Sequence, residues 1–148
     1  MSEYSQTYSA TIAAPAAACF AVLVDFDAYP RWSSPITACR VLDRHEGGLP
    51  RRVDFNLDMG IKTLHYVLEY TWDPPQGARW NLVEGDVRGV TGSYRFEEAG
   101  GQTRATCTQE IDLGFWVPGF IRSTFEKKAL RDSVEELKRA VEARSPAT

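Results

Sequence analysis

Apolar and polar residues alternate through most of the middle of the chain, and a period of two is typical of β-strands that bury one face. In the range 52–59 every second residue is apolar, and these residues are Val53, Phe55, Leu57 and Met59. Runs of the same character recur on both sides. The pattern predicts seven strands, over 3–13, 36–46, 52–59, 61–72, 79–84, 88–97 and 103–113.

The end of the chain has a longer period. From residue 130 onward the apolar residues are three or four positions apart, at Leu130, Val134, Leu137 and Val141. This spacing places them on one stripe of an α-helix. We predict that the helix begins around Pro118 and ends at about Arg144.

A shorter helical region is predicted between the first two strands. Pro15 suits the first turn of a helix over 16–26, because its missing N–H would have no partner there. We expect Phe20, Val24 and Leu23 to face inward. A second helical turn is expected over 28–33.

Glycine and proline cluster at 45–48, 73–77, 85–86 and 100–101, between predicted strands. Tight turns of this kind join antiparallel neighbours, and an antiparallel sheet curls. The long helix needs a surface on which to bury its stripe. We therefore predict an α+β fold in which the final helix lies across a curved sheet, within a single domain spanning 1–148.

Composition excludes several classes of function. The 148 residues are 43% apolar, which is enough for one core and leaves no room for a second domain. The net charge is −3 and the basic residues are scattered, which argues against a nucleic-acid partner. No run approaches the roughly 18 apolar residues of a membrane span, and the first residues do not resemble a signal peptide. We expect a cytoplasmic protein without an integral membrane span.

Cysteines and histidines do not predict a metal site. Cys19, Cys39 and Cys107 are far apart and lack CxxC spacing, so we interpret them as small buried hydrophobic residues. His45 falls in a turn, where exposure is expected, and His65 falls on the polar face of its strand. Without an HExxH pattern, a GxSxG stretch or a phosphate-binding loop, no metal or cofactor is predicted.

The apolar face of the predicted strands is rich in aromatic residues: Phe55, Tyr66, Tyr70, Trp72, Trp80, Tyr94 and Phe96. Two interpretations remain open. These side chains either pack directly against the helix, or they line a pocket for a small molecule, because one helix does not obviously fill the concavity of a long sheet.

Two further features could belong to such a pocket. Gln109 is a polar residue on the inward face of its strand, where its amide could orient a ligand or bond to a tyrosine hydroxyl. Ile121 and Phe125 lie on the side of the final helix opposite the main stripe. They are predicted to be covered by loops, to form a pocket mouth or to contact a partner, including a second copy in a homodimer.

Several short motifs, in this order, resemble the START-like superfamily, nearest to its bacterial polyketide cyclase/dehydrase and lipid-transport branch. They are Pro15 opening a helix, DFDAYPRW at 25–32, WNLVEG at 80–85, GSYRF at 92–96 and Val117-Pro118 before a long helix. The resemblance implies a helix-grip fold: a seven-stranded antiparallel sheet around a long C-terminal helix, with two short helices after the first strand and an enclosed hydrophobic cavity.

The resemblance also suggests ligand-binding residues. By position, the candidates are Trp32, Phe55, Tyr66, Trp80, Tyr94, Gln109 and Phe125. It does not fix the activity, because one fold serves many functions. We expect binding or transport of a small hydrophobic ligand such as a lipid, fatty acid, quinone or polyketide. The alternative is a polyketide aromatase/cyclase, for which Tyr66, Tyr94 or Arg95 would handle protons.

Overall fold

The computed structural model describes residues 6–58, 60 and 62–144, and the side chains at 121 and 123–125 lie outside the description. In chain order the elements are β1 (Gln6–Ile12), α1 (Ala16–Leu23), η1 (Phe26–Ala28), α2 (Tyr29–Trp32), β2 (Ile36–Arg44), β3 (Pro50–Asp58), β4 (Thr63–Asp73), β5 (Gly77–Gly85), β6 (Gly89–Ala99), β7 (Gln102–Asp112) and α3 (Gly119–Arg144). The predicted α+β helix-grip fold is confirmed.

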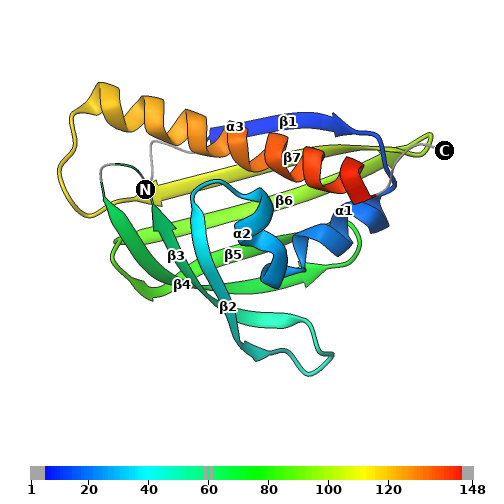
Figure 1. Ribbon diagram of the computed structural model, residues 1–148, viewed down its shortest axis with the longest axis horizontal. Helices are drawn as coiled ribbons and strands as arrows, with labels where there is room; N and C mark the ends of the chain where they lie inside the picture. The colour runs from blue at the N-terminus through cyan, green and yellow to red at the C-terminus, as the bar shows by residue number, and fades with distance from the viewer. Residues whose placement is uncertain (1–5, 59, 61, 145–148) are drawn as a thin grey trace.

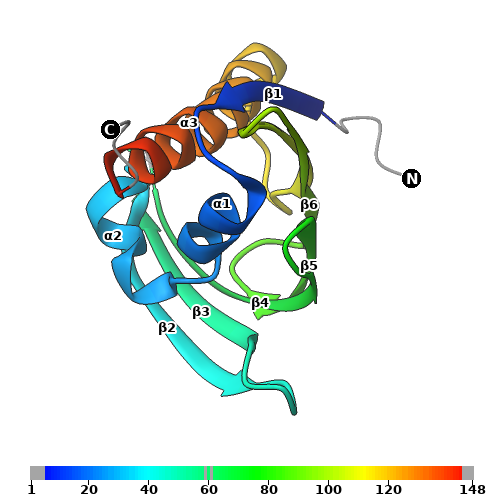
Figure 2. The ribbon, with the colours of Figure 1, turned by 90° about the vertical axis from the view of Figure 1, so that its right-hand side faces the viewer.

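The seven strands form one antiparallel sheet in the order β1-β7-β6-β5-β4-β3-β2. Strands β2 to β6 are each paired with the next strand in the chain, whereas β1 pairs with β7, from Gln6 opposite Gln109 to Ile12 opposite Thr103. The sheet curls, and the short helices lie within its concavity (Figures 1 and 2). Gly100 and Gly101 have φ values of +63° and +80°, the left-handed conformation that the tight β6–β7 turn requires.

The long helix buries the stripe that the sequence predicts. Leu130, Val134, Leu137 and Val141 are each at most 4% exposed. Helix α3 lies over β1 and β7 and also contacts α1 (Figure 1). Burial of each aliphatic side chain is worth roughly 1.5–3 kcal/mol, so this contact holds the helix on the sheet.

The first helix differs from the prediction. It ends at Leu23, and the chain continues through Asp25 into η1. Cys19, Val22 and Leu23 are the buried residues of its later turns, whereas Phe20 and Val24 are only half-buried. Leu23 is buried as expected, and Phe20 faces inward although it is only half-buried, because its ring packs against Trp72 at the edge of the core. Val24 is half-buried at the end of the helix.

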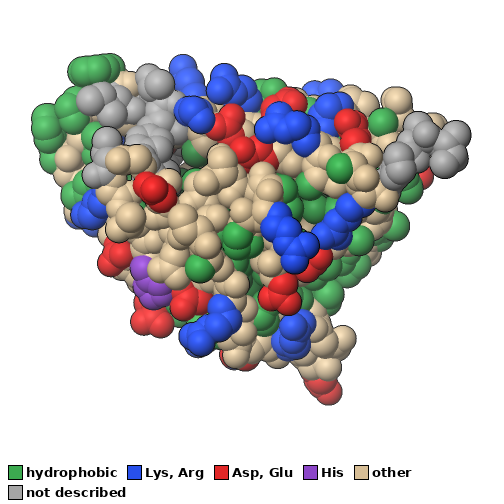
Figure 3. Space-filling model, in the orientation of Figure 1, with side chains coloured by type: hydrophobic (Ala, Val, Ile, Leu, Met, Phe, Trp, Pro, Cys, Tyr) green, Lys and Arg blue, Asp and Glu red, His purple; other side chains and the backbone are tan. Residues whose placement is uncertain are grey.

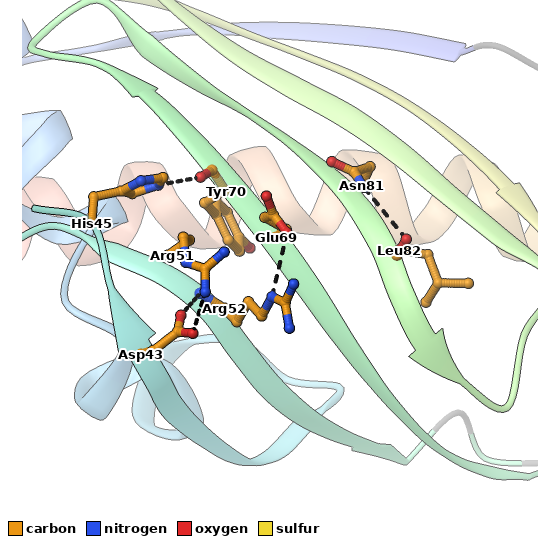
Figure 4. Close-up of polar contacts among 8 residues, drawn as sticks. All are labelled: Asp43, His45, Arg51, Arg52, Glu69, Tyr70, Asn81 and Leu82. Atoms are coloured by element: carbon orange, nitrogen blue, oxygen red, sulfur yellow. Dashed lines mark hydrogen bonds and ion pairs between the residues drawn. The ribbon is translucent and has the colours of Figure 1, made fainter.

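Some polar residues on the sheet pair with residues of the neighbouring strand (Figure 4). Arg52 on β3 lies 3.4 Å from the carboxylate of Glu69 on β4. His65 is an exposed outer residue as predicted, with its Nε2 atom 2.5 Å from Asp54. His45 differs from the prediction: it is half-buried, and its Nε2 atom lies 2.7 Å from the carbonyl oxygen of Tyr70, which ties the β2–β3 turn to β4.

All three cysteines are free. Cys19 and Cys107 are buried as predicted, and Cys39 is half-buried. Within the described part of the chain, His, Cys, Asp and Glu form no group of three or more that could hold a metal ion. Among the described residues, no helix is both long enough and apolar enough to cross a membrane.

Candidate ligand-binding cavity

A cavity of about 380 Å³ lies between the concave face of the sheet and the helices. The sheet contributes mainly aromatic and aliphatic side chains: Ile36, Phe55, Leu57, Tyr66, Leu68, Tyr70, Trp80, Tyr94 and Ile111, with Asp58 and Gln109. The helices and the segment before β2 contribute Leu23, Tyr29, Trp32, Ser33, Ser34, Pro35, Lys128, Ala129, Asp132, Ser133 and Glu136. The aromatic face of the sheet is therefore only partly covered by the helices.

Helix α1 determines where this hollow ends. Trp72 on β4 packs edge-on against Phe20 of α1, with ring centroids 5.5 Å apart, and Phe26 lies 6.0 Å from the same indole. Phe96 is buried in the core beside Tyr94. Trp72 and Phe96 are thus part of the packed core rather than the cavity wall. One part of the aromatic face therefore packs in the core, and the other part lines the cavity, so each of the two interpretations of the sequence applies to a different part.

The position of Trp80 depends on a glycine in the neighbouring strand. Gly92 on β6 pairs with Trp80 on β5, and the indole lies directly over the glycine. A Cβ atom at position 92 would come within 2.4 Å of the indole ring. The ring is held on its other sides by Tyr70 and Tyr94, each with its centroid 5.7 Å away. Because a side chain at 92 would clash, only glycine lets the indole lie flat on the sheet as the cavity floor.

Helix α3 presents a small, polar face to the cavity. Ala129, Ser133 and Glu136 are four and three residues apart, so they form a stripe beside the buried apolar one. The hydroxyl of Ser133 lies 2.5 Å from the hydroxyl of Tyr94 on β6. Sequence reasoning missed this face because it followed only the apolar stripe, although the same helical spacing would have identified it.

The cavity reaches the surface between α3, the segment before β2 and the end of β3. Three of its lining residues there are exposed: Ser34, Asp58 and Lys128. The Ser34 backbone N–H donates to Glu136 at 3.0 Å, which joins α3 to the segment before β2. Lys128 lies 2.5 Å from Asp132. The carboxylates of Glu136 and Asp132 are therefore already engaged at the mouth.

Several polar groups on residues of the cavity wall lack a hydrogen-bond partner among the described residues. The indole N–H groups of Trp32 and Trp80 are buried and donate no hydrogen bond to any described residue. The same part of the chain provides no partner for the Gln109 amide or the Tyr66 hydroxyl. Among the described residues, no tyrosine hydroxyl forms a hydrogen bond with Gln109. A bound ligand could satisfy the Tyr66 hydroxyl and the Gln109 amide, whereas the two indole N–H groups are inaccessible even to water.

The cavity tyrosines are neutral hydrogen-bonding groups. Burial raises the pKa of the Tyr66 and Tyr94 hydroxyls above the usual value for tyrosine, because the phenolate would lose its hydration. Tyr29 donates its hydroxyl proton to the carbonyl oxygen of Leu23. At neutral pH these residues offer O–H groups rather than charges. Arg95, expected from sequence to handle protons, is exposed and lies 4.0 Å from Glu97, away from the cavity.

The candidate residues named from sequence occupy this site, with one exception. Six of the seven line the cavity: Trp32, Phe55, Tyr66, Trp80, Tyr94 and Gln109. The side chain of Phe125 lies outside the described residues. Tyr29, part of the DFDAYPRW stretch, was not selected as a site residue. The segment 33–36 was also missed, because its position over the cavity depends on how the chain leaves α2.

A smaller hollow of about 10 Å³ adjoins the cavity on the far side of Gln109. Glu126 of α3 faces it together with Gln6 of β1. The Glu126 Oε1 atom is buried without a hydrogen-bond partner among the described residues. Burial raises the pKa of this carboxyl, and the nearby Arg122 partly opposes the shift. Gln109 thus separates the main cavity from a buried carboxyl group.

A curved antiparallel sheet that holds a long helix over a hydrophobic hollow defines the helix-grip class of small-molecule-binding folds. The family model for polyketide cyclase / dehydrase and lipid transport proteins matches residues 5–142. The chain belongs to this family. No curated protein matches the sequence.

Solved structures show the same fold. A START superfamily protein from Mycobacterium smegmatis has a TM-score of 0.86 at 19% identity, with 94% of this chain and 97% of that chain covered. The Zhui aromatase/cyclase from Streptomyces sp. R1128 has a TM-score of 0.83 at 18% identity, with 97% and 96% covered. A protein from Thermus thermophilus also has a TM-score of 0.83, at 19% identity, with 96% and 99% covered.

Proposed function

We propose that the protein binds or carries a small hydrophobic ligand in the 380 Å³ cavity. The observation that carries this proposal is an aromatic hollow, open at the surface, in which the Tyr66 hydroxyl and the Gln109 amide have no hydrogen-bond partner among the described residues. Cavities of roughly 300–1,000 Å³ with apolar walls and a few polar groups are typical of small-molecule sites. Burial of apolar ligand surface, at about 25 cal/mol per Å², would supply most of the affinity.

The arrangement of polar groups favours a planar ligand with carbonyl oxygens over a fatty acid. Tyr66 and Gln109 line the hollow with groups that can donate hydrogen bonds, and Trp80 and Tyr94 offer ring faces for stacking. A fatty-acid carboxylate would need a cation, and Lys128 at the mouth is already paired with Asp132. A quinone or an aromatic polyketide fits this arrangement, because its rings can stack on the aromatic side chains and its oxygens can accept hydrogen bonds.

Native mass spectrometry of the purified protein, together with thermal shift measurements on delipidated protein, tests the proposal. We expect a quinone or polycyclic aromatic ketone to raise the melting temperature more than a saturated fatty acid of similar size. Gln109→Leu keeps a side chain of similar size but removes the amide donor, and it should reduce the shift. A protein that no compound in a broad hydrophobic panel stabilises would contradict the proposal.

An aromatase/cyclase activity is the second candidate, and the neutral Tyr66 hydroxyl in the cavity favours it. In an aldol closure, an enol carbon forms a bond to a ketone carbon. Tyr66 could donate its proton to the developing alkoxide, and the proton released by the enol hydroxyl would restore the tyrosine before water is lost. The Zhui protein, which is named an aromatase/cyclase, has the same fold. If Tyr66→Phe and Tyr94→Phe leave the products formed from a poly-β-ketone unchanged, this candidate fails.

A further inference from the structure

The start of α3 carries large aromatic side chains that face solvent. Trp116 is 85% exposed and Phe120 is 76% exposed. The other two exposed large hydrophobic residues in the described part of the chain, Leu42 and Val83, lie on strands and are 43% and 38% exposed. Hydrophobic side chains gather at the end of the molecule where α3 begins (Figure 3). Trp116 and Phe120 therefore form the most exposed aromatic pair of the described surface, which we call the aromatic tip.

Basic residues surround the aromatic tip. Residues 114–131 contain Arg122, Lys127, Lys128 and Arg131 against the single acid Glu126, so their formal charge is +3 in a chain of net charge −3. Phe120, Lys127 and Arg131 are seven and four residues apart, which places these three exposed side chains on one outer stripe of the helix. The tip is thus the aromatic end of a basic helical face.

The neighbouring loops add to this charge. The Lys62 ammonium lies 4.3 Å from the ring centroid of Phe115, just before the tip. Arg88 packs beside Gly114 and lies 3.7 Å from Asp112, so its charge is partly neutralised there. Asp132 similarly pairs with Lys128 and with Arg131 at 3.6 Å. Lys62 and Lys127 form no ion pair with another described residue, which leaves both charges available.

We propose that the aromatic tip docks the protein on an anionic lipid surface. Exposed Trp and Phe beside Lys and Arg are typical of segments that lie in the membrane interface, where the rings insert and the cations contact acidic headgroups. A second copy of the chain fits less well. Two aromatic side chains offer roughly 150–250 Å² each, which is well below the roughly 800 Å² per partner of a stable interface.

The tip lies at the end of the molecule where the cavity opens. Lys62 belongs to the β3–β4 connection that follows Asp58, and Asp58 lines the cavity mouth. Lys128, two turns after Phe120 in α3, lines it from the other side. The end of β3, the beginning of β4 and the beginning of α3 all lie at this end (Figure 1). Docking there would place the mouth next to the lipid surface and allow a hydrophobic ligand to pass between bilayer and cavity, a role that rests on the proposed function.

Sedimentation of the full chain with lipid vesicles tests the docking. We expect binding to vesicles of phosphatidylcholine and phosphatidylglycerol in equal parts, weaker binding at high salt, and little binding to phosphatidylcholine alone. Trp116→Ala with Phe120→Ser should weaken binding at least ~tenfold, because most of the inserted apolar area is lost. Lys62→Gln with Lys127→Gln should weaken it only on the anionic vesicles. Leu42→Ser with Val83→Ser, the matched exposed control, should bind as the unaltered protein does.

Two results would overturn the docking proposal. One is the absence of binding to anionic vesicles by the unaltered protein. The other is a dimer in light scattering that Trp116→Ala disrupts, because the tip would then be a protein contact. Ligand-induced thermal stabilisation, measured without vesicles, distinguishes a failure of the docking proposal from a failure of the proposed function. It should persist in the Trp116→Ala, Phe120→Ser protein. Its absence in the unaltered protein would count against the cavity proposal alone.

Discussion

The hydroxyl oxygens of Tyr94 and Ser133 lie 2.5 Å apart, which joins β6 to α3 within the wall of the cavity. Other polar links between α3 and the sheet lie outside this hollow, such as the Tyr8 hydroxyl that donates to Glu135 at 2.7 Å. The Tyr94–Ser133 bond therefore holds the helix over the cavity at a place where apolar contact is incomplete. It is both a structural link and part of the surface that a ligand would meet.

Removing either hydroxyl should weaken this link. Tyr94→Phe and Ser133→Ala are each expected to lower the free energy of unfolding by about 0.5–1.5 kcal/mol, the usual net value of one hydrogen bond. Because both changes break the same bond, the double variant should lose less than the sum of the two. Urea denaturation of all four proteins measures this. Strict additivity would show that the two hydroxyls do not interact in solution.

Gly92 should be intolerant of a side chain. Gly92→Ala places a Cβ atom against the Trp80 indole, so the ring must leave the cavity floor. We expect a loss of about 1–3 kcal/mol in stability, as for overpacked cores, together with weaker ligand binding. Gly89→Ala on the same strand is the matched control, since the nearest atom to its added Cβ would be 3.8 Å away. Equal behaviour of the two variants would refute the proposed role of Gly92.

Filling the cavity from the helix should block ligand binding without unfolding the protein. Ala129 lines the cavity on α3, whereas Ala143 is exposed near the end of the same helix. Ala129→Trp should weaken the apparent affinity for the ligand at least ~tenfold, as measured by ligand-induced thermal stabilisation, because the indole takes up much of the space. Ala143→Trp should bind as the unaltered protein does. Unchanged binding by Ala129→Trp would place the ligand elsewhere.

Glu142 should stabilise the fold at neutral pH and not in acid. Its carboxylate accepts the Ala13 backbone N–H at 2.9 Å and contacts Lys138 at 3.1 Å, and chiefly the backbone hydrogen bond lowers its pKa in the folded state. A lowered folded pKa adds stability above the unfolded pKa, and this is lost as pH falls through the folded value. Glu142→Gln should therefore lower the melting temperature at pH 7 and have a diminishing effect toward pH 3. Glu46→Gln, in an exposed turn, serves as the control.

Replacing Glu126 should change the melting temperature in the opposite direction to replacing Glu142. Burial raises its pKa, so the folded protein holds this proton more tightly than the unfolded chain does. The stability from the protonated form is present below the unfolded pKa and is lost as pH rises through the folded one. Glu126→Gln should consequently raise the melting temperature at pH 7 and leave it nearly unchanged at pH 3. A lower melting temperature at pH 7 would indicate that the carboxylate has a stabilising partner.

The sequence predicted the fold well because its signals were local and repeated. Alternation at Val53, Phe55 and Leu57 has one explanation, a strand with one buried face, and all three residues are buried. Positions such as Phe20 were harder to predict. Its exposure depends on how α1 lies inside the concavity, which is a tertiary contact with Trp72 that no short pattern contains.

The cavity itself was predictable only as an alternative. Aromatic residues on one strand face do not reveal which of them meet a helix, and Tyr66 and Trp72 differ in this respect although both lie on β4. The polar face of α3 at Ser133 carried a usable periodic signal that the apolar stripe concealed. His45 was expected to be exposed because it lies in a turn, but its contact with the Tyr70 carbonyl depends on how that turn folds back onto β4.

The pairing of β1 with β7 also constrains how the protein can be made. Gln6 lies opposite Gln109, so β1 has no sheet partner until β7 has been synthesised. Contacts between residues so distant in sequence slow folding, since the intervening chain must be ordered before they can form. A nascent chain stopped before residue 102 would retain a meander of β2 to β6 with β6 as an open edge, and it would be a natural target for chaperones.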